Sequence, residues 1–273
     1  MPCGRVAVMT QPRVSDYVRD QFGPGLVLVG GFFRMCVLTG KALFRVPFQW
    51  HEFVLMCWFI IRVSLMPTMA VAVPVTVLFD FVFNLLLIQA GVGDISGAGT
   101  AVAVITQIGP IVTVLVVAGA CATAICADLG ARTIREEIDA MEVLGIDPIH
   151  RLVVPRVVAM STVAMLLNGL VSMIGLVGGY IFGVYLQNIS GGAYLSTLTL
   201  VVGLPEVLVA TFKAFIFGLI AGLVSCYRGL TVKGGPKGLG IAVNETVVMC
   251  VVFLYAVNVV LTAIGVRFGT GAR

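Results

Sequence analysis

The sequence predicts an all-α integral membrane protein with five transmembrane helices. Hydrophobic residues make up 59% of the 273 residues, charged residues only 11%, and the mean hydropathy is +1.09. A soluble domain carries roughly 25% charged residues, so too few charges exist here to cover a water-facing surface. Five apolar stretches are long enough to cross a bilayer core, which takes about 20 residues per helix. All five should be helices, because lipid offers the backbone no hydrogen-bond partners.

The chain divides into an N-terminal tail, one membrane domain and a C-terminal tail. Residues 1–23 carry charges and lack an apolar run before a small-residue cleavage site, so no signal peptide is predicted. The membrane domain covers residues 24–266, and residues 267–273 form the outer C-terminal tail. The spans are expected at about 53–90, 100–127, 157–186, 205–227 and 245–266.

Residues 24–46 form a further apolar region, which is expected to lie in the membrane interface. Arg34, Lys41 and Arg45 fall on one helical face at i, i+7 and i+11, and aromatic and aliphatic residues fill much of the rest. This pattern is typical of an amphipathic helix that lies in the membrane plane ahead of the first span.

The first span, residues 53–90, is too long for a simple crossing. As a helix it would extend roughly 57 Å, against a hydrocarbon core of about 30 Å. Pro67 and Pro74 lie inside it and should kink or break the helix. The sequence leaves open whether the helix tilts or projects beyond the membrane.

The positively charged residues predict the orientation of the chain. Of the 17 Lys and Arg residues, 13 fall in residues 1–52, 128–156 and 228–244, and none falls in the predicted outer loops 91–99 and 187–204. Since Lys and Arg concentrate on the cytoplasmic side, the N-terminus should be cytoplasmic and the C-terminus periplasmic.

A dense polar segment lies between the second and third spans. Thr133 and Glu136 have capping-box spacing, which predicts a helix over residues 134–144. Its polar face, where neighbouring charges can pair, comprises Arg135, Asp139 and Glu142. Its apolar face comprises Ile134, Ile138 and Met141, with Leu144 at the edge.

The end of this helix is also marked in the sequence. Gly145 should stop it in a left-handed conformation, and Asp147 and Pro148 should be the N-cap and first residue of the next helix. A helix this short is marginal in water, so its apolar face must pack on something. Two interpretations stay open: a solvated loop helix, or a docking element for a cytoplasmic partner.

Several kinds of chemistry are not expected of this chain. It has no G-x-x-x-x-G-K-[ST] motif, so it should not hydrolyse ATP itself. His51 and His150 have no Cys or acidic cluster at metal-ligand spacing, and no serine sits in a nucleophile elbow. The seven cysteines are expected to be free, buried thiols. We therefore expect no bound cofactor, no catalytic residues and no nucleic-acid partner.

The run ADLGARTIREEIDAMEVLGIDPIHRLVVPR (127–156) closely resembles the signature of MlaE/YrbE-type permeases, the membrane subunits of lipid-transporting ABC systems. The resemblance covers roughly residues 24–266 and includes the Gln-Ile-Gly-Pro element at 107–110. The leader GGFFRMCVLTGKALFRVPFQW and the ending NETVVMCVVFLYAVNVVLTAIGVRFGTG look like the A-type YrbE subunit of actinobacterial, including mycobacterial, Mce systems.

The resemblance implies that the helix at 134–144 docks in a groove of a separate ATPase, which uses ATP and Mg²⁺. It also implies a second, B-type YrbE permease, a Mce protein hexamer on the outer side, and a location in the bacterial inner membrane. The residues that would couple to the ATPase are Arg135, Glu137, Asp139, Glu142, Gly145, Asp147 and Pro148.

The resemblance also implies a lipid cavity, with Gln107, Pro110, Asp80 and Lys213 as candidate lining residues. Family members often carry Arg-Glu where this chain has Thr106 and Gln107. Either the pocket is more neutral here, or a partner subunit supplies the charge. The substrate would be a fatty acid or a sterol, and the direction import. The alternative is a membrane scaffold that anchors Mce proteins without forming the lipid path.

Two further features of the spans leave alternatives open. Asp80 and Lys213, charged groups at membrane depth, either pair across the first and fourth spans or reach the interface separately. Small residues at Gly175-x-x-Gly178 and Gly218-x-x-x-Gly222 permit close helix contact, within the subunit or at a dimer interface.

Overall fold

The structure is a computed structural model that describes residues 24–43, 49–91, 96–185, 190–201 and 203–270. Its described residues contain helices and no strand, and five segments are long and apolar enough to span a membrane. The predicted all-α fold with five spans is therefore confirmed. The spans are Trp50–Gln89, Gly97–Ile134, Ile149–Tyr185, Pro205–Leu230 and Gly235–Gly265.

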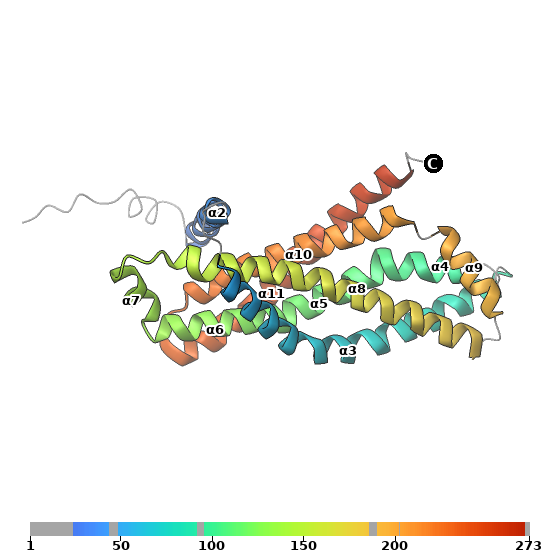
Figure 1. Ribbon diagram of the computed structural model, residues 1–273, viewed down its shortest axis with the longest axis horizontal. Helices are drawn as coiled ribbons and strands as arrows, with labels where there is room; N and C mark the ends of the chain where they lie inside the picture. The colour runs from blue at the N-terminus through green and yellow to red at the C-terminus, as the bar shows by residue number, and fades with distance from the viewer. Residues whose placement is uncertain (1–23, 44–48, 92–95, 186–189, 202, 271–273) are drawn as a thin grey trace, which may run out of the picture.

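The helices form an elongated bundle, with α7 at one end and α4 and α9 near the other (Figure 1). The second span is built from five consecutive helical pieces, two of which are π-helical turns. The elements are α2 Pro24–Leu43, α3 Trp50–Gln89, α4 Ser96–Ala103, η2 Val104–Ile108, α5 Gly109–Val116, η3 Val117–Cys121, α6 Ala122–Ile134, α7 Glu137–Val143, η4 Ile149–Val153, α8 Val154–Tyr185, α9 Gly191–Val201, α10 Leu204–Leu230 and α11 Gly235–Thr270.

The helices at the α7 end extend beyond the apolar stretches that predicted them. The second span continues to Ile134, the third begins at Ile149 and the last helix begins at Gly235. Hydropathy marks only the part of a helix that lies in lipid, whereas the backbone hydrogen bonds continue into the polar segments. The helices at this end are therefore longer than their apolar stretches alone.

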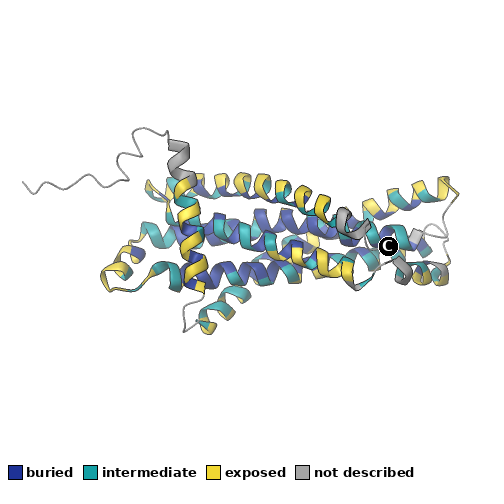
Figure 2. Cartoon of the chain, turned by 90° about the horizontal axis from the view of Figure 1, so that it is seen from above, coloured by how far each residue is buried: buried dark blue, intermediate teal, exposed yellow. Residues whose placement is uncertain are grey.

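Helix α2 lies across the bundle rather than along it, as an in-plane helix must (Figures 1 and 2). Its own Met35 and Ala42 are buried, while its Phe33 and Val37 are exposed. Phe32 meets Tyr227 of α10 edge-on, with ring centroids 5.7 Å apart. The helix predicted for residues 24–46 is confirmed over Pro24–Leu43, and Arg45 lies outside the described residues.

Helix α3 is one continuous helix of 40 residues with Pro67 and Pro74 inside it. It bends along its length in Figure 1 without breaking, as expected where proline removes a backbone hydrogen bond. Its buried residues recur at every fourth position and are nearly all small or polar. They are Ile60, Ser64, Thr68, Ala72, Thr76, Asp80 and Asn84.

This stripe packs against α8, where glycines let the two backbones approach closely. A Cβ on Gly175 would lie 3.4 Å from Thr76, and one on Gly179 would lie 3.1 Å from Asp80. The Thr76 hydroxyl donates to the Ala72 carbonyl at 2.7 Å, so its polarity is satisfied within its own helix. Small side chains with internally bonded hydroxyls thus form the contact between the first and third spans.

Glycines of α10 make a second close contact with α8. A Cβ on Gly218 would lie 2.5 Å from the Ser161 Cα, and one on Gly222 would lie 3.1 Å from the Val157 Cα. These small-residue spacings therefore serve packing within the subunit, which the sequence had left open.

The predicted loop 187–204 is wrong in part, because it contains helix α9. Tyr194 of α9 is fully buried, and its hydroxyl lies 2.9 Å from the Thr100 hydroxyl of α4. A buried aromatic ring with one hydrogen-bonded polar atom anchors α9 onto the bundle. The stretch reads as a loop in sequence because its glycines and hydroxyl residues are typical of turns.

Candidate functional site

The coupling segment is the chain between α6 and η4, residues 135–148, and its helix is shorter than predicted. Helix α6 runs through Ile134, Glu136 adopts a left-handed conformation with φ 59°, and α7 covers Glu137–Val143. The predicted capping box is wrong, because the Thr133 hydroxyl lies 3.0 Å from the Leu129 carbonyl instead. The cause is tertiary: the same hydroxyl lies 3.1 Å from the Gly229 carbonyl, so α6 continues along α10.

The charged face of α7 differs from the predicted arrangement. Arg135 precedes the helix, and its Nε lies 2.9 Å from a Glu137 carboxylate oxygen. The predicted grouping of Arg135 with Asp139 and Glu142 on one helical face is therefore wrong. Asp139 and Glu142 are exposed, together with Glu137. Three acidic side chains consequently face solvent on one short helix.

The apolar residues of the coupling segment divide between the core and the surface. Ile138 is buried in the main core and Met141 packs against it. Val143 and Leu144 are 88% and 74% exposed, respectively, although Leu144 was expected at the edge of the inward stripe. Figure 2 shows this end of the bundle largely exposed. The segment thus rests on its own domain and presents an apolar tip outward.

The end of α7 follows the sequence prediction. Gly145 has φ +75°, its N–H donates to the Glu142 carbonyl at 3.0 Å, and the Ile146 N–H donates to the Met141 carbonyl at 3.0 Å. This pair of bonds is the Schellman ending, in which glycine supplies the left-handed residue. The predicted stop at Gly145 is confirmed.

The start of the next helix is also confirmed. The Asp147 side chain accepts a hydrogen bond from the Ile149 N–H at 3.0 Å, and helical structure begins at Pro148. Aspartate caps the free N–H groups of the first turn, and proline needs no partner there.

A buried ion pair joins the two helices that flank the coupling segment. Arg156 of α8 is 2% exposed, and its guanidinium donates to Asp128 of α6 at 2.6 Å and to the Leu152 carbonyl at 2.9 Å. The second Asp128 oxygen lies 3.3 Å from Arg132. Sequence reasoning missed this pair, although its two members lie at either end of the signature-like run 127–156.

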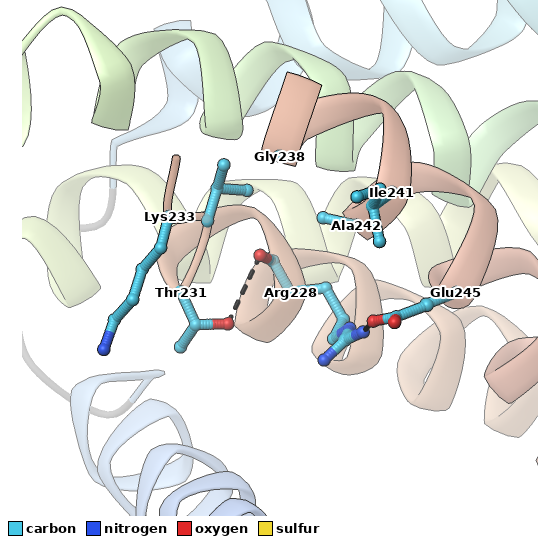
Figure 3. A pocket seen from close by; sticks show the side chains of 8 residues that line it. Arg228, Thr231, Lys233, Gly238, Ile241, Ala242 and Glu245 are labelled. Atoms are coloured by element: carbon cyan, nitrogen blue, oxygen red, sulfur yellow. Dashed lines mark hydrogen bonds and ion pairs between the residues drawn. The ribbon is translucent and has the colours of Figure 1, made fainter. Parts of the chain in front are cut away.

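A second ion pair closes the neighbouring turn at the same end. Arg228 of α10 contacts Glu245 of α11, and both line a pocket with Thr231, Lys233 and Gly238 (Figure 3). The turn itself passes through Gly234 and Gly235, both with positive φ. The helix pairs α6–α8 and α10–α11 are thus each joined by an Arg–carboxylate contact at this end.

The candidate cavity residues Gln107 and Pro110 lie at an irregular point of the second span. Gln107 is half-buried in the π-helical turn η2, where the Gly109 N–H bonds the Val104 carbonyl five residues back. Pro110 has no N–H and cannot donate to the Thr106 carbonyl four residues earlier. The same spacing between a π-helical turn and a proline recurs later in the chain. There η4 ends two residues before Pro155, as η2 ends two residues before Pro110.

Lys213 lies close to the Thr106 carbonyl, which cannot accept an α-helical hydrogen bond from Pro110. Its ammonium lies 3.4 Å from the Thr106 carbonyl and 2.9 Å from the Thr262 hydroxyl of α11. Asp80 instead faces Gly179 of α8, so the hypothesis of an Asp80–Lys213 pair is wrong. The alternative that both reach the interface is wrong as well, since they are 0% and 4% exposed.

Five apolar spans, a helix across them at one end and a short helix between the second and third spans define a multi-pass helical membrane protein. The model of the family "Permease MlaE" matches residues 53–264. The chain therefore belongs to the MlaE permease family, as its signature-like run predicted.

Individual relatives are consistent with this assignment. The chain is 33% identical over 156 residues to a probable ABC transporter permease of Synechocystis, covering 57% of this chain and 59% of that relative. It is 28% identical over 201 residues to the TRIGALACTOSYLDIACYLGLYCEROL 1 protein of Arabidopsis thaliana chloroplasts, covering 74% and 56%. It is 27% identical over 176 residues to the intermembrane phospholipid transport system permease MlaE of Haemophilus influenzae, covering 64% and 67%. The chain covers about three fifths of the length of the Synechocystis permease and of a similar probable permease of Rickettsia typhi.

Proposed function

We propose that the chain is the permease subunit of an ABC transporter that moves lipids across the bacterial inner membrane, driven by a separate ATPase that uses ATP and Mg²⁺. Its N-terminus is cytoplasmic and its C-terminus periplasmic. Its partners are a B-type YrbE permease, a cytoplasmic ATPase and a Mce protein hexamer on the outer side. The substrate is a fatty acid or a sterol, and the direction is import. The names of the relatives and the A-type YrbE-like leader support this proposal.

The single observation that carries the proposal is the exposed tip of the coupling segment. Val143 and Leu144 are mostly exposed beside the exposed acids Asp139 and Glu142. Exposed large apolar side chains rimmed by charges are typical of a protein interface. The ATPase covers this tip, with the apolar pair supplying affinity and the acids fixing the register.

The coupling segment is built to pass movement to the third span. Gly145 and Asp147 fix the turn after α7 through backbone and side-chain hydrogen bonds. The Asp128–Arg156 pair holds the two flanking helices together beneath it. Because these contacts connect α7 rigidly to its neighbours, displacement of α7 by the ATPase moves α6 and α8 with it.

The lipid path lies along the irregular part of the second span. Gln107 and Pro110 occupy or flank a π-helical turn, a feature that is frequent at functional sites. Lys213 contributes a positive charge bonded to Thr106 and Thr262. With Gln107 in place of an acid, this wall is neutral to positive.

The docking role can be tested with charge reversals on α7. In the double variant Asp139→Lys/Glu142→Lys, repulsion replaces attraction at the ATPase surface, so co-purification of the ATPase should fall at least tenfold. Lipid-stimulated ATP turnover should fall with it. The measurement is ATPase recovered per permease, together with its turnover in nanodiscs.

The matched control is Lys233→Glu/Lys237→Glu, which reverses two exposed charges on the neighbouring α10–α11 turn. It should retain the ATPase. Unchanged ATPase recovery and turnover in the α7 variant would show that the docking assignment is wrong. Normal recovery of ATPase and Mce protein without any lipid-stimulated turnover in the native complex would favour the scaffold alternative.

A further inference from the structure

Two polar side chains of α3 are buried without partners near the α9 end of the bundle. Asp80 and Asn84 are both 0% exposed. Among the described residues, neither oxygen of the Asp80 carboxyl and neither polar atom of the Asn84 amide has a hydrogen-bond partner. The two residues lie one helical turn apart on the stripe that faces α8.

Two buried polar side chains without hydrogen bonds strongly destabilise the folded state unless a further group binds them. Burial of an amide or carboxyl without hydrogen bonds is strongly unfavourable, and burial of an isolated carboxylate is more so. Native proteins pair nearly all their buried polar groups, and charged groups at membrane depth usually mark a site. Something must therefore satisfy Asp80 and Asn84 in the folded protein.

A glycine of α8 lets polar atoms of two other helices approach closely beside Asp80. A Cβ on Gly179 of α8 would lie 3.1 Å from an Asp80 carboxylate oxygen and 2.7 Å from the Tyr194 hydroxyl of α9. The carboxylate and hydroxyl oxygens thus flank the same glycine from two different helices. They make no hydrogen bond with each other, as Asp80 has no such partner among the described residues.

The hydrogen bonds of Thr100 determine whether the Tyr194 hydroxyl is a donor or an acceptor toward Asp80. The Thr100 hydroxyl donates to the Gly97 carbonyl at 3.2 Å and lies 2.9 Å from the Tyr194 hydroxyl. Because threonine has a single hydroxyl hydrogen, both bonds form together only if Tyr194 donates to Thr100. The Tyr194 oxygen is then an acceptor beside the acceptor oxygens of Asp80.

No positive charge of the described helices compensates this cluster of oxygens. The titratable groups near the packed ends of these helices are Asp80 on α3, Tyr180 and Tyr185 on α8, and Tyr194 on α9, while the described α4 contributes none. Tyr180 contacts Tyr194 ring to ring at 5.8 Å. Lys213 of α10 is bonded elsewhere, to Thr106 and Thr262.

We propose that Asp80, Asn84 and Tyr194 form a binding site for a small monovalent cation, Na⁺ or H⁺, held between the first and third spans and α9. Na⁺ would be neutralised by the Asp80 carboxylate, with the Asn84 carbonyl and the Tyr194 oxygen as further ligands. H⁺ would instead bond to one Asp80 oxygen, and the resulting neutral acid would donate a hydrogen bond to the Asn84 carbonyl or the Tyr194 oxygen. A monovalent ion fits because one carboxylate leaves a neutral site, whereas a divalent ion would leave a net charge buried. The bound cation secures α9 against α3 and α8. This site is independent of the docking of an ATPase.

The site can be tested by the melting temperature of the full-length chain, purified with its partners in nanodiscs. Melting is followed in NaCl, KCl and choline chloride at equal ionic strength, at pH 6 and pH 8. If the cation is Na⁺, NaCl should raise the melting temperature by about 4 °C over choline at roughly tenfold saturation. If it is H⁺, the melting temperature should instead be higher at pH 6 than at pH 8, because the folded state then binds the extra proton.

The variant Asp80→Asn should abolish either dependence, since a neutral amide needs no cation. Tyr194→Phe, which keeps the ring and Asp80, should weaken the dependence and provides a second test if Asp80→Asn does not fold. The control Glu206→Gln, an acid on α10 that caps the Gly203 N–H, should keep the native dependence. A native protein that melts identically in all three salts and at both pH values would overturn the proposal. So would an Asp80→Asn variant with an unchanged cation or pH response.

Discussion

At the scale of single residues, the most consequential contact is the Asp128–Arg156 pair beneath the coupling segment. Arg156 is nearly fully buried, whereas the Asp128 side chain is 28% exposed and also contacts Arg132. The two members of the pair are therefore unequal. Loss of the carboxylate leaves a buried guanidinium with only the Leu152 carbonyl, while loss of Arg156 leaves a partly solvated carboxylate.

This asymmetry predicts the order of two substitutions. Asp128→Asn should destabilise the protein by about 3 kcal/mol, because an uncompensated buried charge remains. Arg156→Met should cost less, about 1 to 2 kcal/mol, and the double variant should recover part of the loss. Unfolding titrations of all four proteins measure these differences. Strictly additive losses would mean that the pair makes no net contribution.

The sequence predicted some of these residue conformations and missed others. Gly145 and Asp147 were predictable because only a few residue types suit a left-handed stop or an N-cap. Glu136 was not, since a glutamate with φ 59° follows no local preference. The Asp128–Arg156 pair was not predictable either, because in the sequence the two residues are only charges at the ends of separate predicted spans.

At the scale of elements, glycines decide how α3, α8 and α10 fit together. Gly218 faces the backbone of α8, where an added Cβ would approach the Met160 carbonyl oxygen to 2.6 Å. Backbone atoms cannot move aside as a flexible side chain can, so the two helices would have to separate.

The variant Gly218→Ala should therefore lower the melting temperature by several degrees, as overpacking typically costs about 1 to 3 kcal/mol. The matched control is Gly169→Ala in α8, where nothing lies within 4 Å of the added Cβ. The control should be neutral or slightly stabilising, because alanine favours the helix over glycine by about 1 kcal/mol. Equal effects of the two variants in thermal melts would contradict the close α8–α10 contact.

At the scale of the whole molecule, the two ends of the bundle carry different chemistry. The α7 end holds exposed acids, an exposed apolar tip and two Arg–carboxylate contacts. The α9 end holds the buried oxygen cluster of Asp80, Asn84 and Tyr194. The distribution of Lys and Arg predicts that the α7 end is cytoplasmic.

Labelling with a membrane-impermeant maleimide tests this orientation. A thiol introduced by Val143→Cys should react only after the cells are permeabilised, whereas one introduced by Gly192→Cys should react in intact cells. Both positions are exposed. The unsubstituted chain measures the background from its own thiols, because Cys36 and Cys57 are half-buried and the other four described cysteines are buried. The reverse labelling pattern would invert the proposed topology.

The sequence by itself determined the membrane class, the number of spans, the helix across the bundle, the end of the coupling helix at Gly145 and the start of the next helix at Pro148. These follow from composition, the length of apolar runs and local backbone preferences, which act between residues close in the chain. Only the tertiary structure decided that α6 continues through Ile134 and that residues 191–201 form a helix. It also decided that Asp80 and Lys213 stay apart and that Asp128 meets Arg156. These features depend on contacts between helices far apart in sequence, and no local pattern records which helices become neighbours.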